Sequence, residues 1–281
     1  MGAPAIAGWR PHRIAGCPDA VDITVEEAVT LPLELPSETV HLWYMSVTDT
    51  RILLDNHLSV LDEEEKYRAN QFHFERDRTR FILARGSLRS LLARYTGSDP
   101  ALIRFKQNRY GKPFLQHPHS PVQFNITHSA GFIIHAIAHG TELGVDVEFV
   151  RNSAGLASVA SYFAPGEQAW LRAVDPQERD VRFFTLWVCK EAYIKALGRG
   201  LSKSLDSFEI SLETRKGRKE GAEGMEPRIL SDSENHGAPE SWRLVLFKPG
   251  EDILGCLAIN SATQIVELRE YGTEQIMHSL S

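Results

Sequence analysis

The most informative stretch of this chain reads Trp187-Val-Cys-Lys-Glu-Ala-Tyr-Ile-Lys-Ala-Leu-Gly-Arg-Gly-Leu201. If the stretch is helical, Trp187, Glu191 and Lys195 are four residues apart and share one face. A Glu followed four residues later by a Lys is also an ordinary helix-stabilising pair, worth about 0.2 to 0.5 kcal/mol. A catalytic interpretation of this face therefore needs partner groups from another part of the chain.

A second pair of carboxylates lies upstream, in Gly144-Val-Asp-Val-Glu148. In a strand over 145–150 the odd-numbered residues face the core, so Asp146 and Glu148 share the opposite face. They lie about 7 Å apart along the strand, close enough to converge on one cation. Oxygen ligands without Cys or His favour Mg²⁺ or Mn²⁺. Acidic residues that alternate with valine are also common on the exposed side of a sheet, so this pair alone is not specific.

Two further segments carry groups that suit phosphate. Phe124-Asn-Ile-Thr-His-Ser129 ends a predicted strand with small polar side chains and an imidazole, which can donate hydrogen bonds to phosphate oxygens. His128 is the predicted anchor, although a single histidine at a strand end is more often exposed or satisfied in the core. Gly111-Lys112-Pro113 is either a simple turn or a close backbone approach that offers the lysine as a point charge.

The charge distribution indicates an acidic partner or a polyanionic ligand. The whole chain of 281 residues has a net charge of −6, but residues 66–112 contain twelve Lys or Arg and three acids, so this segment is +9 and the remainder is −15. The alternative is a solvated helix face with an excess of arginine. Nucleic acid is a weaker candidate, because the chain has no aromatic platform, zinc finger or basic repeat.

Bulk properties are those of an ordinary soluble protein, with 42% hydrophobic and 24% charged residues and room for one large domain or two small ones. Apolar runs are shorter than the roughly 20 residues that cross a bilayer, and Met1 to Pro36 lacks the order of a signal peptide. We therefore expect a cytoplasmic protein with no membrane partner. Cys17, Cys189 and Cys256 are widely separated and are predicted to be reduced packing residues.

Periodicity and turn signals predict the element order. The first part contains a strand over 40–45, a helix over 62–95 and strands over 103–106, 122–127, 132–138 and 145–150, with 140–144 as a hairpin link between the last two. The second part contains helices over 157–196 and antiparallel strands over 208–212, 242–247, 253–259 and 265–269. The insert 214–239 has too little apolar material to pack and is predicted to be mobile. No repeat is visible at the level of residues.

Together and in this order, the four segments resemble the phosphopantetheinyl transferase superfamily, specifically its long single-chain type related to the surfactin-synthetase activator. The resemblance runs from about Trp43 to Leu212, and Thr127 replaces the family's usual serine while keeping the hydroxyl. It implies a reaction that moves the 4′-phosphopantetheine arm of coenzyme A to a serine of an apo acyl or peptidyl carrier protein. The other product is adenosine 3′,5′-bisphosphate.

The resemblance also implies an α+β fold of two similar subdomains, each a helix packed on a small antiparallel sheet, with coenzyme A in the cleft between them. Residues 1–36 form an N-terminal extension, 37–143 the subdomain that binds the coenzyme A phosphates, and 144–281 the subdomain that binds metal. The implied protein is a monomer that binds a carrier protein and no nucleic acid. Carrier proteins are usually acidic around the serine, so basic surface near the cleft is the expected docking face.

Site residues follow from the same resemblance. Asp146, Glu148 and Glu191 are implied to bind Mg²⁺, with Mn²⁺ as the alternative, and Glu191 to deprotonate the serine directly or through water. Lys195 is implied to hold phosphate and to act in catalysis. Further contacts to coenzyme A are expected from Arg68, Arg109, Lys112, Asn125, Thr127, His128 and Ser129. Which of Arg76, Arg78 and Arg80 touches the ligand stays open.

Two other classes of function remain as alternatives. A non-catalytic module that binds coenzyme A or a carrier protein would have no need for the intact set of Asp146, Glu148, Glu191 and Lys195. A metal-dependent phosphohydrolase could use the same groups. The chain has no Walker glycine loop and no nuclease-type histidine cluster to favour the second alternative.

Overall fold

The computed structural model describes residues 33–47, 51–129, 131–151, 155–214, 225–234, 239–250, 252–261 and 265–270. Two halves repeat one element order, with η3 (Pro239–Ser241) as an addition in the second half. The first half contains β1 (Thr39–Ser46), α1 (Arg51–Ser59), α2 (Glu63–Asn70), α3 (Glu75–Thr96), η1 (Pro100–Leu102), β2 (Arg104–Gln107), β3 (Pro113–His117), β4 (Val122–Ser129) and β5 (Phe132–His139). The second half contains β6 (Leu143–Phe149), α4 (Leu156–Ala160), α5 (Pro165–Ala173), α6 (Arg179–Leu197), η2 (Gly200–Ser202), β7 (Phe208–Thr214), β8 (Met225–Asp232), β9 (Arg243–Gly250) and β10 (Ile253–Ile259).

Strand pairing repeats as well. In the first half β1, β5 and β4 lie side by side in that order, and β6, β10 and β9 do the same in the second half, with antiparallel neighbours throughout. Each half adds a two-stranded ribbon, β2 with β3 and β7 with β8. The predicted pair of similar α+β subdomains is therefore confirmed, and the repeat that the residues do not reveal is visible in the topology.

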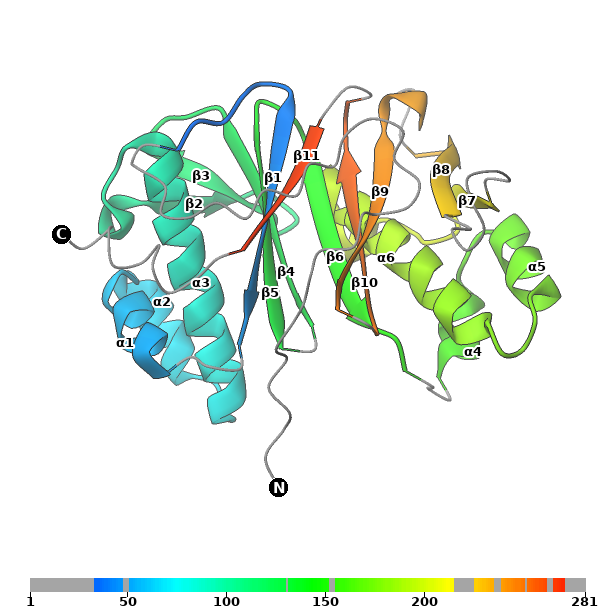
Figure 1. Cartoon of the computed structure of the whole chain (residues 1–281), viewed down its shortest axis with the longest axis horizontal. Helices are drawn as coiled ribbons and strands as arrows, with labels where there is room; N and C mark the ends of the chain where they lie inside the picture. Colours follow the sequence, from blue (N-terminus) through cyan, green and yellow to red (C-terminus); the bar gives the residue numbers. More distant parts are fainter. Residues whose placement is uncertain are drawn as a thin grey trace.

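Three buried clusters stack the elements into four layers. The outer face of the first sheet packs on α3 through residues such as Trp43 and Leu88, and α6 packs on the second sheet. The inner faces of the two sheets meet in a third cluster that includes Val40, Ile134 and Val145. Figure 1 shows the result, with α1 to α3 on one outer side, α4 to α6 on the other and the two larger sheets between them, while β7 and β8 lie on the side of α5.

Two strand pairings differ from the sequence-based prediction. The link 140–144 does not close a hairpin, because β6 pairs with β10 and not with β5. The alternate valines of β6 are instead buried against the facing sheet of the first half. The last strand, β11 (Ile265–Glu270), was predicted to be antiparallel but pairs with β1 in parallel, so the end of the chain extends the first sheet.

Three smaller differences have local causes. The predicted helix over 62–95 is broken between α2 and α3, where Phe72 turns to pack on Phe81 with ring centroids 5.4 Å apart. Residues 225–232 of the predicted mobile insert form β8, because alternate residues such as Ile229 are apolar enough to be buried. Phe149 was predicted to face the core but is 40% exposed, because it is the last residue of β6 and lies outside the shared cluster.

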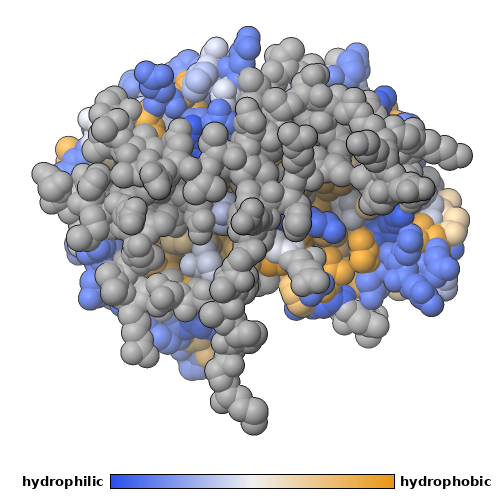
Figure 2. All heavy atoms as spheres, in the orientation of Figure 1, coloured by the Kyte–Doolittle hydropathy of each residue, from blue (hydrophilic) through white to orange (hydrophobic). Residues whose placement is uncertain are grey.

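Residues 1–32 of the predicted extension, and 215–224 and 235–238 of the predicted insert, lie outside the described residues. Among the helices that the structure describes, each is too short or too polar to cross a membrane. Figure 2, in the same orientation, shows mostly hydrophilic side chains at the periphery and a group of hydrophobic ones over the second half, on the side of α4 and α6. Large exposed apolar side chains of that half include Phe149, Tyr162 and Val181.

Candidate functional site

The carboxylates predicted from the two motifs are brought together where β6 lies on α6. Val145 and Val147 point into the shared core, so Asp146 and Glu148 face the helix, as the alternation predicts. The glycine at 144 makes this packing close, because a Cβ there would lie 2.2 Å from the carbonyl oxygen of Ala192. The helix face that carries Glu191 and Lys195 therefore lies directly against the strand.

The edge strand of the first half, β4, is joined to β6 by side chains. Asn125 Oδ1 accepts a hydrogen bond from the backbone N–H of Val145 at 2.9 Å. Thr127 Oγ1 donates to Asp146 Oδ1 at 3.2 Å, and Ser129 Oγ donates to Glu148 Oε2 at the same distance. Asn125 thus holds the backbone of β6, and Thr127 and Ser129 hold the two carboxylates, because side chains at a spacing of two share a strand face.

Lys195 binds one carboxylate oxygen of Asp146, whereas the other oxygen receives no hydrogen bond within the described residues. Its Nζ lies 2.5 Å from Asp146 Oδ1 and 3.3 Å from both Thr127 Oγ1 and the carbonyl oxygen of Val145. Asp146 Oδ2 is buried and has no hydrogen-bond partner among the described residues. A buried oxygen in this state costs about 1 to 3 kcal/mol, so the site favours a ligand that binds it.

Burial raises the pKa of all three carboxyl groups, and the charge of Asp146 raises those of Glu148 and Glu191 further. Burial is the largest cause of the raised pKa of Asp146, although Lys195 opposes it. Burial and then the charge of Asp146 raise the pKa of Glu148. The same two causes raise the pKa of Glu191, with a smaller contribution from Glu148. This mutual repulsion is what a bound cation relieves.

The oxygen atoms of Asp146, Glu148 and Glu191 are suitable ligands for a hard divalent cation, but the three side chains are not arranged in a coordination geometry. Carboxylate oxygens with an unsatisfied buried member are the ligands that Mg²⁺ and Mn²⁺ prefer. Among the residues described, no three His, Cys, Asp or Glu side chains are arranged closely enough to hold an ion as they stand. Lys195 holds Oδ1 of Asp146, so the oxygen of Asp146 without a hydrogen bond is Oδ2.

Residues beside the carboxylates complete the site. The sequence predicts only that Trp187 shares a helix face with Glu191 and Lys195. In the structure the Trp187 side chain also forms a hydrogen bond with Glu148. His128 is exposed at the end of β4, and partial burial followed by the charge of Arg80 lowers its pKa. Among the three arginines left open by sequence, Arg80 is one whose charge acts on His128, and its guanidinium is held 2.8 Å from Asp77.

Three basic residues predicted to bind coenzyme A form no hydrogen bond or ion pair with the carboxylates in the described part of the chain. Arg68 and Arg109 are exposed and rest on aromatic rings, 5.3 Å from the centroid of Phe81 and 4.6 Å from that of Tyr110. Neither is linked to the carboxylates by a hydrogen bond or ion pair within the described residues. Lys112 is engaged by two backbone carbonyls of the second half. The structure therefore joins the predicted metal ligands to β4 and Lys195 but not to these three.

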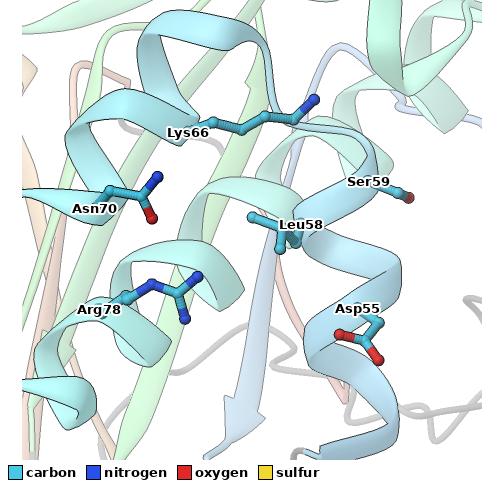
Figure 3. A pocket seen from close by; sticks show the side chains of 6 residues that line it. All are labelled: Asp55, Leu58, Ser59, Lys66, Asn70 and Arg78. Atoms are coloured by element: carbon cyan, nitrogen blue, oxygen red, sulfur yellow. The ribbon is translucent and has the colours of Figure 1, made fainter.

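A hollow of about 380 Å³ lies between α1, α2 and α3, well within the first half (Figure 3). It is lined by Asp55, Leu58, Ser59, Lys66, Asn70 and Arg78. Lys66 is already paired with Glu63 at 2.9 Å, and Arg78 with Glu75 at 3.1 Å. None of the lining residues is a member of the carboxylate site, so we do not assign the chemistry to this hollow.

Comparison with known proteins gives one family for both halves of the chain. Residues 142–246 match the model of the 4′-phosphopantetheinyl transferase superfamily, and residues 48–139 match that of the 4′-phosphopantetheinyl transferase N-terminal domain. The chain is 37% identical over 230 residues to the 4′-phosphopantetheinyl transferase HetI of Nostoc sp., covering 81% of this chain and 90% of the relative. It is 33% identical over 156 residues to the 4′-phosphopantetheinyl transferase Sfp of Bacillus subtilis, covering 55% of this chain and 68% of the relative.

Proposed function

Because the chain belongs to the 4′-phosphopantetheinyl transferase superfamily, we propose that it transfers the 4′-phosphopantetheine arm of coenzyme A to a serine hydroxyl of an apo acyl or peptidyl carrier protein. Adenosine 3′,5′-bisphosphate is the leaving group. The observation that carries the proposal is the group of Asp146, Glu148, Glu191 and Lys195, with one buried carboxylate oxygen unsatisfied. Such a group suits chemistry at a pyrophosphate.

The proposed cation site consists of Asp146, Glu148 and Glu191, with Mg²⁺ or Mn²⁺ as the ion. When bound, the ion would neutralise charge on the pyrophosphate. Thr127 and Ser129 orient the first two carboxylates through the hydrogen bonds that they donate. The repulsion among the carboxylates supports this assignment, since it favours any ligand that brings positive charge.

The proposed base is Glu191. In the transfer step the serine oxygen forms a bond to the phosphorus that carries the pantetheine arm, and the bond from that phosphorus to the bridging oxygen breaks. The serine proton passes to the Glu191 carboxylate, directly or through one water. A carboxylate whose pKa is raised is a better proton acceptor, which supports this role.

Lys195 is proposed to exchange partners when coenzyme A binds. Its short contact to Asp146 holds one ligand of the cation site. A pyrophosphate oxygen offers the ammonium group a second anionic partner, and transfer of the contact would free the second oxygen of Asp146 as well. His128 and Arg80 are close enough to interact electrostatically and are proposed to face the phosphates as well.

Apart from that for Lys112, the remaining expectations stay proposals with two amendments. Arg68 and Arg109 present guanidinium groups on the first half for the nucleotide, whereas Asn125 is buried and acts by holding Val145. The division into 37–143 and 144–281 is kept, except that β11 pairs with β1 of the first half. We further propose that the enzyme acts as a monomer in the cytoplasm, on a carrier protein that docks on basic surface near the site.

The decisive experiment is incubation of the purified protein with Mg²⁺, coenzyme A and a panel of apo carrier proteins. Mass spectrometry should detect a carrier that has gained one phosphopantetheine arm on its serine. A serine-to-alanine carrier is the matched control and should gain nothing. Release of free phosphate without carrier modification would indicate a phosphohydrolase, and tight binding of coenzyme A without either product would indicate a binding module.

A further inference from the structure

The turn between β2 and β3 is held rigid by one side chain. Asn108 Oδ1 accepts hydrogen bonds from the backbone N–H groups of Tyr110 and Lys112 at 2.9 and 3.0 Å. The backbone N–H of Asn108 donates to the carbonyl of Lys112, and that of Gly111 donates to the carbonyl of Asn108, both at 3.0 Å. Because the turn is closed on itself, the direction of the Lys112 side chain is set by the first half.

This turn is bonded to three carbonyls of the second half. Asn108 Nδ2 donates to the carbonyl oxygen of Gly198 at 2.8 Å. Lys112 Nζ donates to the carbonyl oxygens of Ala196 at 2.7 Å and of Leu143 at 3.1 Å. The last carbonyls of a helix have no partner within the helix, and its C-terminal end attracts a cation. Lys112 and Asn108 therefore bond the C-terminal end of α6 from outside.

The bonded carbonyls lie next to the candidate site. Ala196 directly follows Lys195, and Leu143 opens β6 three residues before Asp146. Lys112 thus spans the joint between the helix that supplies Glu191 and Lys195 and the strand that supplies the other two carboxylates. A shift of α6 along β6 would break one of its two contacts.

Within the described residues, the corresponding end of α3 has one such connection, from the backbone N–H of Leu33 to the carbonyl oxygen of Arg94 at 3.0 Å. Gly97 and Gly198 both end their helices in the left-handed conformation, each with φ of 63°. A Cβ placed on Gly97 would meet nothing within 4 Å. A Cβ on Gly198 would lie 2.7 Å from Lys112 Cδ and 2.9 Å from Asn108 Nδ2. The end of α3 is thus bonded through one backbone group, whereas the end of α6 is bonded by the side chains of Asn108 and Lys112.

We propose that Asn108 and Lys112 form a clasp that fixes α6 against β6, and that Lys112 is a positioning residue for the transfer and not a ligand of phosphate. The inference rests on the proposed function. Its physical basis is that a misplacement of about 1 Å at a reacting centre can cost about 10²-fold in rate. Burial, which lowers the pKa of Lys112 to about 8, agrees with a side chain that is engaged in the protein.

The first test separates positioning from ligand binding. Lys112→Met should lower kcat about tenfold and change KM for coenzyme A less than twofold, because the phosphate contacts are left in place. Lys112→Arg should restore part of kcat, since a guanidinium can donate to the same carbonyls. Lys106→Met, an exposed lysine of the same ribbon, is the control and should be unchanged. A tenfold rise in KM with kcat intact would overturn the proposal.

The second test keeps Lys112 but moves its side chain away from the end of α6 by a substitution at Gly198. Gly198→Ala should reproduce the kcat loss of Lys112→Met, because the new methyl group lies where Lys112 Cδ packs. The double variant should lose little more than either single variant, since both break one contact. Gly97→Ala carries the same backbone strain without the collision and should keep kcat within about twofold. Full kcat in Gly198→Ala would contradict the clasp.

Hydrogen exchange gives a readout that needs no transferase activity. Amides at the end of α6 and the start of β6 should exchange faster in Lys112→Met and Gly198→Ala than in the wild type and the two controls. If the wild type modifies no carrier but exchange still responds, the proposed function fails and the clasp stands. If carriers are modified but exchange is unchanged in both variants, the clasp fails. Should Gly198→Ala not fold, Lys112→Arg and Lys112→Met decide the matter.

Discussion

The two long helices, α3 and α6, are built to the same plan. Each contains one fully buried cation, Arg89 in the first and Lys190 in the second, and each ends at a glycine eight residues later. Each cation pairs at 2.7 Å with the third residue of an earlier helix, Glu65 of α2 or Glu167 of α5. Both glutamates also accept a hydrogen bond from the residue that precedes their helix.

The difference begins one residue after the buried cation. That position is Ser90 in α3 and Glu191 in α6. In the first half, His41 and Trp43 of β1 both contact the Tyr95 hydroxyl, at 2.6 and 2.7 Å, and the other ring nitrogen of His41 lies 3.3 Å from Glu267 Oε2. In the second half, Asp146 keeps an unsatisfied oxygen among like charges. One scaffold is thus used for stability in one half and for chemistry in the other.

The largest effect is expected from breaking the buried pair of α6. Lys190→Met leaves Glu167 buried without its cation and should lower the free energy of unfolding by about 3 to 5 kcal/mol. Arg89→Met should cost less, because Arg85 Nε stays 2.9 Å from Glu65. Urea unfolding measures both. Adding Glu167→Gln should recover part of the loss, and equal costs for the two cations would show that Arg85 does not compensate.

The second effect concerns activity. Glu191→Gln should reduce transfer to the carrier protein about 10³-fold, because the amide can neither accept the proton nor carry charge for the cation. Ser90→Ala, at the equivalent position of α3, is the matched control and should keep its rate. Radiolabelled or mass-based transfer assays at saturating coenzyme A measure this. Comparable losses in the two variants would mean that the halves do not differ in chemistry as we infer.

The alternation of valine and acid in β6 was enough to predict that Asp146 and Glu148 share a strand face. The spacing of four residues was enough to predict that Glu191 and Lys195 share a helix face. The partners of these groups were not predictable, because they depend on contacts between distant segments. Nothing in the sequence near Lys112 indicates that its ammonium meets the end of α6, and the spacing of 140–144 does not reveal that β6 pairs with β10. The charge of a side chain can be read from the sequence, whereas the group that a long side chain contacts depends on how distant segments pack.

A third, intermediate effect is stabilisation by the ion. Mg²⁺ at about 100 times its dissociation constant should raise the free energy of unfolding by about 2.7 kcal/mol, because it binds only the folded carboxylate site. Removal of the ion with a chelator should reverse the gain. Thermal unfolding of the wild type, Glu191→Gln and Ser90→Ala tests this, and the gain should be lost only in Glu191→Gln. A gain that survives in this variant would place the ion elsewhere.

The smallest effect has the opposite sign. Without a divalent cation at neutral pH, Glu191→Gln should stabilise the protein by about 0.5 to 1 kcal/mol, because it removes one of three carboxylates that repel one another. Burial and Asp146 raise the pKa of Glu191, so its ionised form is less favourable in the folded than in the unfolded chain. Ser90→Ala removes no charge and should not stabilise. If Glu191→Gln is instead destabilising without metal, the repulsion is outweighed by contacts of the carboxylate, and the second half is more like the first than the comparison implies.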